Sequence, residues 1–120
     1  MAGYVDGFVI PVPKRKLNAY MRMAKKASKV WKDYGALDYR ECSGDDLNIQ
    51  CGLSFLRGIK LKAGETVVFS WIRYKSRAHR DSVNAKVMKD PRIAGMCDPK
   101  SMPFDVKRMM CGGFKIEVSA

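Results

Sequence analysis

The segment Thr66–Tyr74 restricts the fold of this chain more than any other part of the sequence. Its β-branched and aromatic residues favour a strand, in which successive side chains point to opposite faces of a sheet. One alternation carries Phe69 and Trp71, and the other carries Val68 and Ile72. Because both alternations are apolar, the sequence predicts a strand with a layer of protein packed against each face.

The periodicity on either side of this strand predicts two helices and three further strands. In chain order, the expected elements are a strand at Tyr4–Ile10, a helix at Lys14–Tyr34, strands at Leu37–Cys42 and Thr66–Tyr74, a helix from Ser76 to Lys89, and a strand at Lys107–Val118. This β-α-β-β-α-β order is typical of the ferredoxin-like fold, an α+β arrangement with two helices on one face of a four-stranded antiparallel sheet. A single domain, 1–120, is expected, and segment 43–58 has no clear periodicity.

Proline, serine and glycine residues indicate where these elements begin and end. Pro11 is expected to stop the first strand, and Ser76 has the side chain of a helix N-cap. Gly35 follows the first helix, where a left-handed residue is usually needed. The pair Gly112-Gly113 predicts a bend or bulge in the last strand.

Two helices can cover only one face of the predicted sheet, so a second layer is needed on the other. The simplest source of that layer is another copy of the chain. A homodimer packed sheet against sheet is therefore expected, in the form of a dimeric α/β-barrel.

The charge of the chain raises the question of a nucleic-acid or anionic-surface partner. There are 23 basic and 12 acidic side chains, which give a net charge of +11. Much of the positive charge lies on one face of the first helix, on Arg22, Lys25, Lys26, Lys29 and Lys32. Binding through this face would be nonspecific and would weaken steeply with salt. The third strand lacks the glycine and aromatic pattern of an RNA-recognition motif.

The cysteine pattern and the apolar runs exclude several other classes. Cys42, Cys51, Cys97 and Cys111 contain no Cys-x-x-Cys pair, and one histidine cannot complete a usual zinc set with them. Free thiols, no metal and no cofactor are expected. No apolar run approaches the roughly 20 residues of a membrane helix, and the N-terminal residues lack the pattern of a signal peptide. A cytoplasmic protein is expected.

Several motifs together resemble the YbaA-like family of uncharacterised bacterial proteins, a domain of unknown function. The motifs are Tyr4-Val-Asp-Gly-Phe-Val-Ile-Pro-Val-Pro13, Phe69-Ser-Trp71, Ser76-Arg-Ala-His-Arg-Asp81, Val83-Asn84, Lys86-Val-Met88, Met102-Pro-Phe-Asp105 and Gly112-Gly-Phe114. The resemblance covers nearly the whole chain and implies the dimeric α/β-barrel form of the ferredoxin-like fold. It implies no activity and no catalytic residues.

His79 and Asp6 are the candidate catalytic residues. His79, Val83 and Val87 fall at steps of four, which places the imidazole on the sheet-facing side of the second helix, near its start. A histidine there can act as a general base, or it can only make hydrogen bonds at the edge of the core. Asp6 lies in an apolar strand and needs a partner, for which Arg80, Arg73 and His79 are the candidates.

Arg80, Asn84 and Trp71 are the candidate ligand-binding residues around this position. The same polar residues can instead form a capping and bridging network, and Trp71 can be core. Three functions remain open: binding or conversion of a small molecule near His79, nonspecific binding of nucleic acid or an anionic surface, and a structural dimer without a ligand. The sequence leaves open whether the protein is an enzyme.

Overall fold

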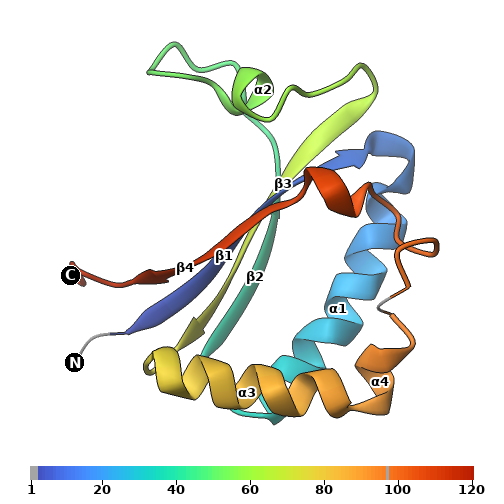
Figure 1. Cartoon of the computed structure of the whole chain (residues 1–120). Coiled ribbons are helices and arrows are strands. Elements are labelled where there is room, and N and C mark those ends of the chain that lie inside the picture. The colour runs from blue at the N-terminus through green and yellow to red at the C-terminus, as the bar shows by residue number, and fades with distance from the viewer. Residues whose placement is uncertain (1–2, 97) are drawn as a thin grey trace.

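The computed structural model describes residues 3–96 and 98–120 and shows helices packed on one face of an antiparallel sheet (Figure 1). The strands are β1 (Tyr4–Pro13), β2 (Asp38–Ser43), β3 (Glu65–Tyr74) and β4 (Met110–Lys115). The α-helices are α1 (Leu17–Asp33), α2 (Phe55–Gly58), α3 (Arg77–Lys89) and α4 (Pro91–Ala94), and short 3-10 turns are η1 (Lys14–Lys16) and η2 (Val106–Arg108).

The strands lie in the order β2-β3-β1-β4, and every neighbouring pair is antiparallel. The long strands β1 and β3 form the centre, with Asp6 opposite Ile72 and Phe8 opposite Ser70. This order, with α1 and α3 as crossovers, confirms the predicted ferredoxin-like fold. We call the face covered by these helices the inner face and the opposite one the outer face.

Strand β1 runs to Pro13, three residues beyond the predicted end at Ile10. Its pairing with β4 stops at Val9, whereas its pairing with β3 continues to Pro13. Among the described residues, one edge of β1 therefore has no partner strand from Ile10 to Pro13. Proline is tolerated at such an edge because no ladder hydrogen bond requires its missing N–H.

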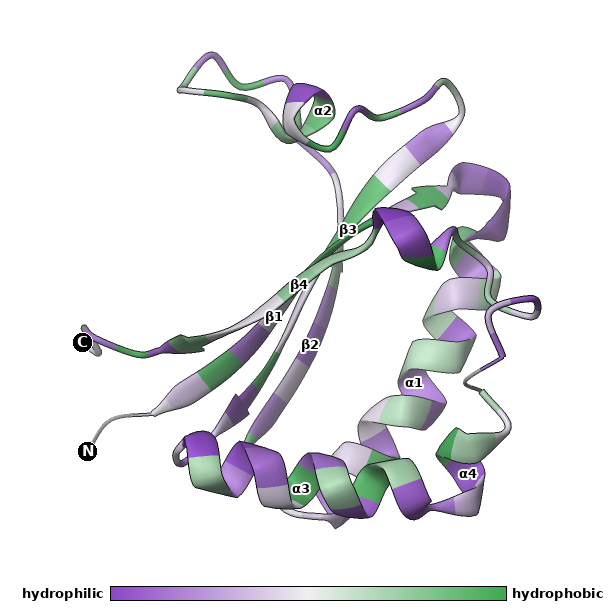
Figure 2. Ribbon diagram, in the orientation of Figure 1, coloured by the Kyte–Doolittle hydropathy of each residue, from purple (hydrophilic) through white to green (hydrophobic). Residues whose placement is uncertain are grey.

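Helix α1 buries one stripe against the inner face and exposes the opposite side. Its buried side chains are Tyr20, Ala24, Ala27 and Val30. Figure 2 shows hydrophilic and hydrophobic residues alternating along α1 and α3, as expected for helices that lie on a sheet. Gly35 follows α1 with a φ of 108°, which confirms the predicted left-handed position.

Helix α3 begins and ends as the sequence predicts. The Ser76 hydroxyl accepts a hydrogen bond from the His79 backbone N–H at 3.1 Å, which caps the first turn. The helix stops before Asp90, whose carboxylate then accepts from the Arg92 N–H at 2.8 Å and caps α4. Val83 and Val87 are the buried residues of α3, in agreement with the predicted face.

Strand β4 is shorter than predicted, and the predicted bulge at Gly112-Gly113 is wrong. The register with β1 is continuous through both glycines. A Cβ atom at position 113 would come within 2.8 Å of the Tyr4 ring. Gly113 therefore gives Tyr4 room to lie across the strand, and no extra residue is inserted.

Residues 44–64 leave the sheet between β2 and β3 and carry the short helix α2, which sequence periodicity did not reveal (Figure 1). We call this segment the arm. The Ser54 hydroxyl caps α2 by accepting from the Arg57 N–H at 3.4 Å. Phe55 packs edge-on against Phe69 of β3, with ring centroids 6.4 Å apart. This contact ties the arm to the outer face.

Candidate functional site

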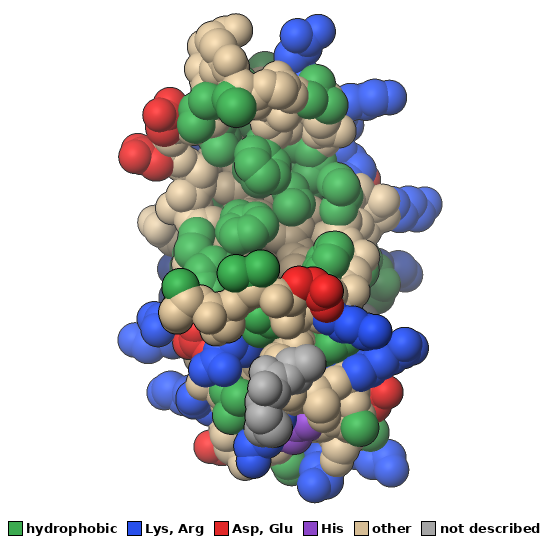
Figure 3. All heavy atoms as spheres, turned by 90° about the vertical axis from the view of Figure 1, so that its left-hand side faces the viewer, with side chains coloured by type: hydrophobic (Ala, Val, Ile, Leu, Met, Phe, Trp, Pro, Cys, Tyr) green, Lys and Arg blue, Asp and Glu red, His purple; other side chains and the backbone are tan. Residues whose placement is uncertain are grey.

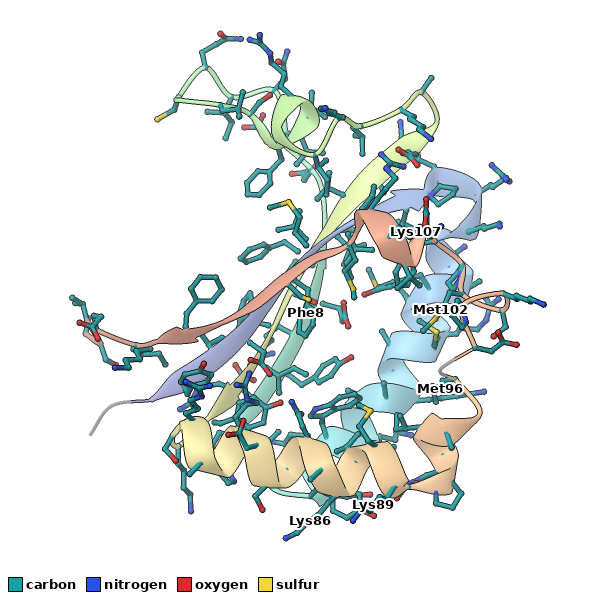
Figure 4. All side chains as sticks on the ribbon, in the orientation of Figure 1. Phe8, Lys86, Lys89, Met96, Met102 and Lys107 are labelled. Atoms are coloured by element: carbon teal, nitrogen blue, oxygen red, sulfur yellow. The ribbon has the colours of Figure 1, made fainter. Side chains whose placement is uncertain are left out.

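A cavity of about 460 Å³ lies between the inner face and the helices (Figure 4). Figure 4 shows Phe8 on the sheet side of this space and Met96 and Met102 on the opposite side. The volume lies in the range of small-molecule sites in proteins. The polar residues that line the cavity include Asp6, Tyr20, Tyr39, Glu41, Ser70, Arg80 and Asn84.

The first polar group of the cavity is built on the buried carboxylate of Asp6. Arg80 of α3 donates from Nη1 to Asp6 Oδ1 at 2.6 Å, and its Nε donates to Asp81 Oδ1 at 2.7 Å. The guanidinium carbon also lies 5.0 Å from the centre of the Tyr4 ring. Two carboxylates and an aromatic face therefore surround the charge of Arg80.

Asn84 links this ion pair to the core. Its Oδ1 accepts hydrogen bonds from Trp31 Nε1 at 3.0 Å and from the Tyr74 hydroxyl at 3.1 Å. Its Nδ2 points at Asp6 Oδ2 at 3.5 Å. Burial is the main cause that raises the pKa of Tyr74, and the negative charge of Asp6 adds to it, so this hydroxyl stays a donor.

The second polar group is built on Glu41 of β2. The Tyr20 hydroxyl donates to Glu41 Oε1 and the Tyr39 hydroxyl donates to Oε2, both at 2.8 Å. Burial raises the pKa of the Glu41 carboxyl, while hydrogen bonds from Tyr20, Tyr39 and Ser70 act against that shift. Burial also raises the pKa of both tyrosines, which therefore remain protonated donors.

The sheet register separates the two carboxyl groups. Glu41 is opposite Ser70, which is opposite Phe8, and Asp6 is two residues along β1 from Phe8. With strands about 4.8 Å apart and a rise of about 3.4 Å per residue, the Cα atoms of Asp6 and Glu41 lie about 12 Å apart. A ligand in the cavity therefore has two separate polar positions to contact.

Apolar and sulfur-containing side chains make up most of the remaining lining. Five methionines contribute, from α1, α3 and the segment that follows α4: Met23, Met88, Met96, Met102 and Met109. Unbranched methionine side chains adapt to ligands of irregular shape. Sequence reasoning missed these residues and Glu41. The alternation of Tyr39 and Glu41 on one face of the predicted second strand was a signal that could have indicated the Glu41 group.

The candidate catalytic pair is not brought together. His79 does not line the cavity, and its Nδ1 accepts a hydrogen bond from the Lys75 backbone N–H at 3.0 Å. Its ring stands edge-on to Tyr74 at 5.9 Å. Of the three partners considered for Asp6, Arg80 is the one that forms an ion pair with it. Catalysis by His79 or Asp6 stays a prediction.

The candidate ligand-binding residues are divided between the two faces. Arg80 and Asn84 line the cavity, and ligand binding by them stays a prediction. Trp71 is placed on the outer face, opposite Gly7 and next to Phe69, with ring centroids 5.8 Å apart. A strand alternates its side chains, so Trp71 cannot share a face with Ile72, which lines the cavity.

The basic side chains on α1 are exposed. Arg22, Lys25, Lys26, Lys29 and Lys32 all lie on the solvent side of this helix. On α3, Lys86 and Lys89 likewise lie on the side turned away from the cavity (Figure 4). Nucleic-acid binding through α1 stays a prediction, and it would not involve the cavity.

Three of the cysteines lie in the described part of the chain. Cys42, Cys51 and Cys111 are exposed and unpaired there, and the prediction of a free thiol at Cys97 falls outside the described residues. Among residues 3–96 and 98–120, no cluster of His, Cys, Asp and Glu has the makeup of a metal site. None of the helices described is both long enough and apolar enough to span a membrane.

Comparison with known protein families shows to which family the chain belongs. Residues 3–106 match the family described as protein of unknown function (DUF1428). The chain belongs to the DUF1428 family. It is 46% identical over 112 residues to the uncharacterized protein YbaA of Escherichia coli strain K12, covering 93% of this chain and 94% of that protein. The Shigella flexneri YbaA protein matches to the same extent. The resemblance inferred from the sequence motifs is confirmed.

Two solved structures resemble the fold of this DUF1428 protein. One is a dimeric ferredoxin-like protein from an uncultured marine organism, with a TM-score of 0.58, 12% identity and full coverage of both chains. The other is an uncharacterized NIPSNAP domain protein from Burkholderia xenovorans, with a TM-score of 0.57, 13% identity, and coverage of 98% of this chain and 94% of that one. At this identity the similarity concerns the fold alone.

Proposed function

We propose that this protein binds a small organic molecule in the cavity between the inner face and helices α1 and α3. The observation that carries the proposal is the combination of a cavity of about 460 Å³ with two hydrogen-bonded carboxyl groups in its lining. A sheet packed only for stability would fill this space with apolar side chains. Polar groups retained in such a space favour ligand recognition.

The lining suits a molecule with an apolar body and a polar end. The methionines and Phe8 would contact the body, whereas the Asp6 or Glu41 group would fix the orientation of the polar end. Apolar contacts supply most of the binding free energy in such sites, and a few placed polar groups supply the selectivity.

Occlusion of the cavity tests this proposal. N-phenyl-1-naphthylamine, an uncharged dye that fluoresces in apolar surroundings, serves as the probe. Ala24 lines the cavity and is 4% exposed, whereas Ala19 lies on the same helix in solvent. The Ala24→Leu variant should bind the probe at least about tenfold more weakly, because its side chain fills the space. The Ala19→Leu variant is the matched control.

Two results would overturn the proposal. The first is no saturable binding of the probe to the wild-type protein. The second is equal affinity in the Ala24→Leu and Ala19→Leu variants, because the probe would then bind elsewhere. Circular dichroism of both variants establishes that they are folded.

The outer face supports a second part of the proposal, that the protein is a homodimer packed through this face. Figure 3 shows apolar side chains gathered over the outer face, with lysine and arginine at its margins. Phe69, Met110 and Phe114 are 45%, 56% and 58% exposed. An apolar patch of this kind usually marks a protein interface. The similar fold described as dimeric agrees with a second copy as the partner.

The arm extends this apolar surface beyond the sheet. Phe55 of α2 is 49% exposed beside Phe69, and Leu53 is 70% exposed. In Figure 1 the arm projects on the side of the sheet opposite to α1. In the proposed dimer, the arm of each copy would cover the margin of its partner's sheet.

A further inference from the structure

The two carboxyl groups of the cavity differ in the charge that surrounds them. Asp6 is paired with Arg80, which also binds Asp81. Glu41 has only hydroxyl partners, and in the described part of the chain no lysine, arginine or histidine forms an ion pair with it. Lys25 of α1 shares a shallow surface depression with Glu41 without an ion pair between them. Glu41 is therefore a carboxyl group without a counter-charge.

Glu41 also has hydrogen-bonding capacity that residues 3–96 and 98–120 do not use. A carboxylate offers about four lone-pair sites on its two oxygens. The tyrosine hydroxyls occupy one site on each oxygen, and the Ser70 hydroxyl acts on the same carboxyl group. At least one acceptor site remains for a donor that enters the cavity.

Aromatic side chains also line the cavity on the side of Glu41. Tyr20 and Tyr39, which hold the carboxyl group, come from α1 and β2. Phe104 stands edge-on to Tyr20 at 5.7 Å, and Trp31 lies tilted against Tyr39 at 6.0 Å. The faces of such rings attract organic cations, and the attraction is stronger where water is excluded.

We propose that the cavity selects an organic cation, an ammonium group on an apolar body, whose nitrogen donates to Glu41 between the rings of Tyr20 and Tyr39. This inference rests on the proposed binding function of the cavity. An anion is disfavoured at the other polar group because two carboxylates already match the one guanidinium of Arg80. The net charge of +11 favours the binding of anions to the surface as a whole. A preference for a cation would therefore have to come from the residues that line the cavity.

Three ligands that share a naphthalene body and differ in the charge of the polar end show which charge the cavity prefers. These are 2-(1-naphthyl)ethylamine, 2-(1-naphthyl)ethanol and 1-naphthylacetate, each used to displace N-phenyl-1-naphthylamine at about pH 7.5. The amine should displace the probe at a concentration about tenfold or more below that of the alcohol, because a charge-assisted hydrogen bond is the stronger one. The acetate should be the weakest. Equal potency of amine and alcohol, or a stronger acetate, would overturn the inference.

Glu41→Gln is the decisive variant, because it removes the charge and keeps the shape of the side chain. The affinity of the variant for the probe is measured first, and relative to that affinity the amine should no longer displace the probe at a lower concentration than the alcohol. Glu117→Gln removes the same charge at an exposed position after β4 and should keep the preference for the amine. A preference that survives in Glu41→Gln would contradict the assignment.

Acidification gives a test that needs no variant. Burial raises the pKa of the Glu41 carboxyl above its ordinary value, so on acidification this carboxylate should be protonated at a higher pH than that of an exposed glutamate. Affinity for the amine should then fall while affinity for the alcohol stays constant; Tyr20 and Tyr39, the other titratable groups at this position, remain protonated throughout. Absence of probe binding would overturn the proposed binding function itself. Probe binding without a preference for the amine would overturn only the inference that the cavity selects a cation.

Discussion

The inner and outer faces of the sheet differ in the polarity and the burial of their side chains. The inner face, covered by α1 and α3, contains buried or half-buried polar residues, Asp6, Glu41 and Ser70. In the part of the chain that the structure describes, no layer covers the centre of the outer face, and aromatic residues such as Phe69 and Phe114 are half exposed there. Polar groups therefore lie where a core is expected, and apolar groups lie where solvent is expected.

This contrast indicates that the faces serve different purposes. Buried polar groups cost stability unless they are hydrogen-bonded, so their presence in a cavity favours a role in recognition. Exposed aromatic residues on a flat sheet favour association with another protein surface. We infer that the inner face holds a ligand and the outer face holds the partner subunit.

The largest expected effect is on assembly. Phe69→Asp places a charge at the centre of the outer face and should dissociate the proposed dimer, since an unpaired charge is strongly disfavoured in an apolar interface. Sedimentation equilibrium should show twice the 13.5 kDa chain mass for the wild type and the single chain mass for the variant. Val118→Asp, at a position 89% exposed after β4, is the control and should remain dimeric. A wild-type protein that sediments as a monomer at micromolar concentration would refute this assignment of the outer face.

The next effect concerns the buried ion pair on the inner face. Asp6→Ala leaves the Arg80 guanidinium without its main buried partner and should lower the free energy of unfolding by about 3 kcal/mol. Asp38→Ala breaks the more exposed pair with Arg40 on β2 and should cost at most about 1 kcal/mol. Urea unfolding at one fixed protein concentration measures both. Equal losses would mean that the two pairs are equally solvated.

A smaller effect is the dependence of stability on pH at Glu41. Its folded-state pKa lies above the ordinary value of 4.5. The stability that this group contributes is therefore complete below about pH 4.5 and is lost as the pH rises through the folded-state pKa. Relative to Glu41→Gln, the wild type should lose stability on going from pH 4 to pH 7.5, because the buried carboxyl must then carry its charge. The loss should be small, because solvent partly screens that charge. Parallel stability profiles of the two proteins would show that the Glu41 environment is not desolvated.

The smallest effect is expected at His79, which lies outside both the cavity and the outer face. His79→Ala removes the acceptor for the Lys75 N–H and should cost about 1 kcal/mol or less. His79→Asn keeps an acceptor close to the same place and should recover part of that loss. A loss of several kcal/mol in urea unfolding would mean that His79 stabilises the start of α3 through contacts other than this hydrogen bond.

The fold could be predicted from the sequence because local signals agreed with the global arrangement. Ser76 caps α3, Gly35 ends α1 with a positive φ, and both alternations of β3 are apolar. The arm could not be placed because its only helix, Phe55–Gly58, is too short for a periodic pattern. The extent of β1 was missed because a free strand edge tolerates Pro11.

The candidate site was only partly predictable. Asp6 was identified because an acid in an apolar strand needs a partner, and Arg80 is that partner. His79 was preferred for its chemistry, although its contacts are with Lys75 and Tyr74 outside the cavity lining. Glu41 was missed because a half-buried strand at the sheet edge resembles a solvated one in composition. Its burial depends on Tyr20, which comes from a distant helix.

Methionine methyl NMR tests the division between the two faces most directly. The chain has eight methionines, and they include Met23, Met96 and Met109 in the cavity lining and Met110 on β4, 56% exposed and opposite Val9 on the outer face. Titration of carbon-13-labelled protein with N-phenyl-1-naphthylamine should shift the methyl signals of Met23, Met96 and Met109 and leave that of Met110 unchanged. A shift of Met110 without shifts of the other three would place the ligand on the outer face and contradict this account.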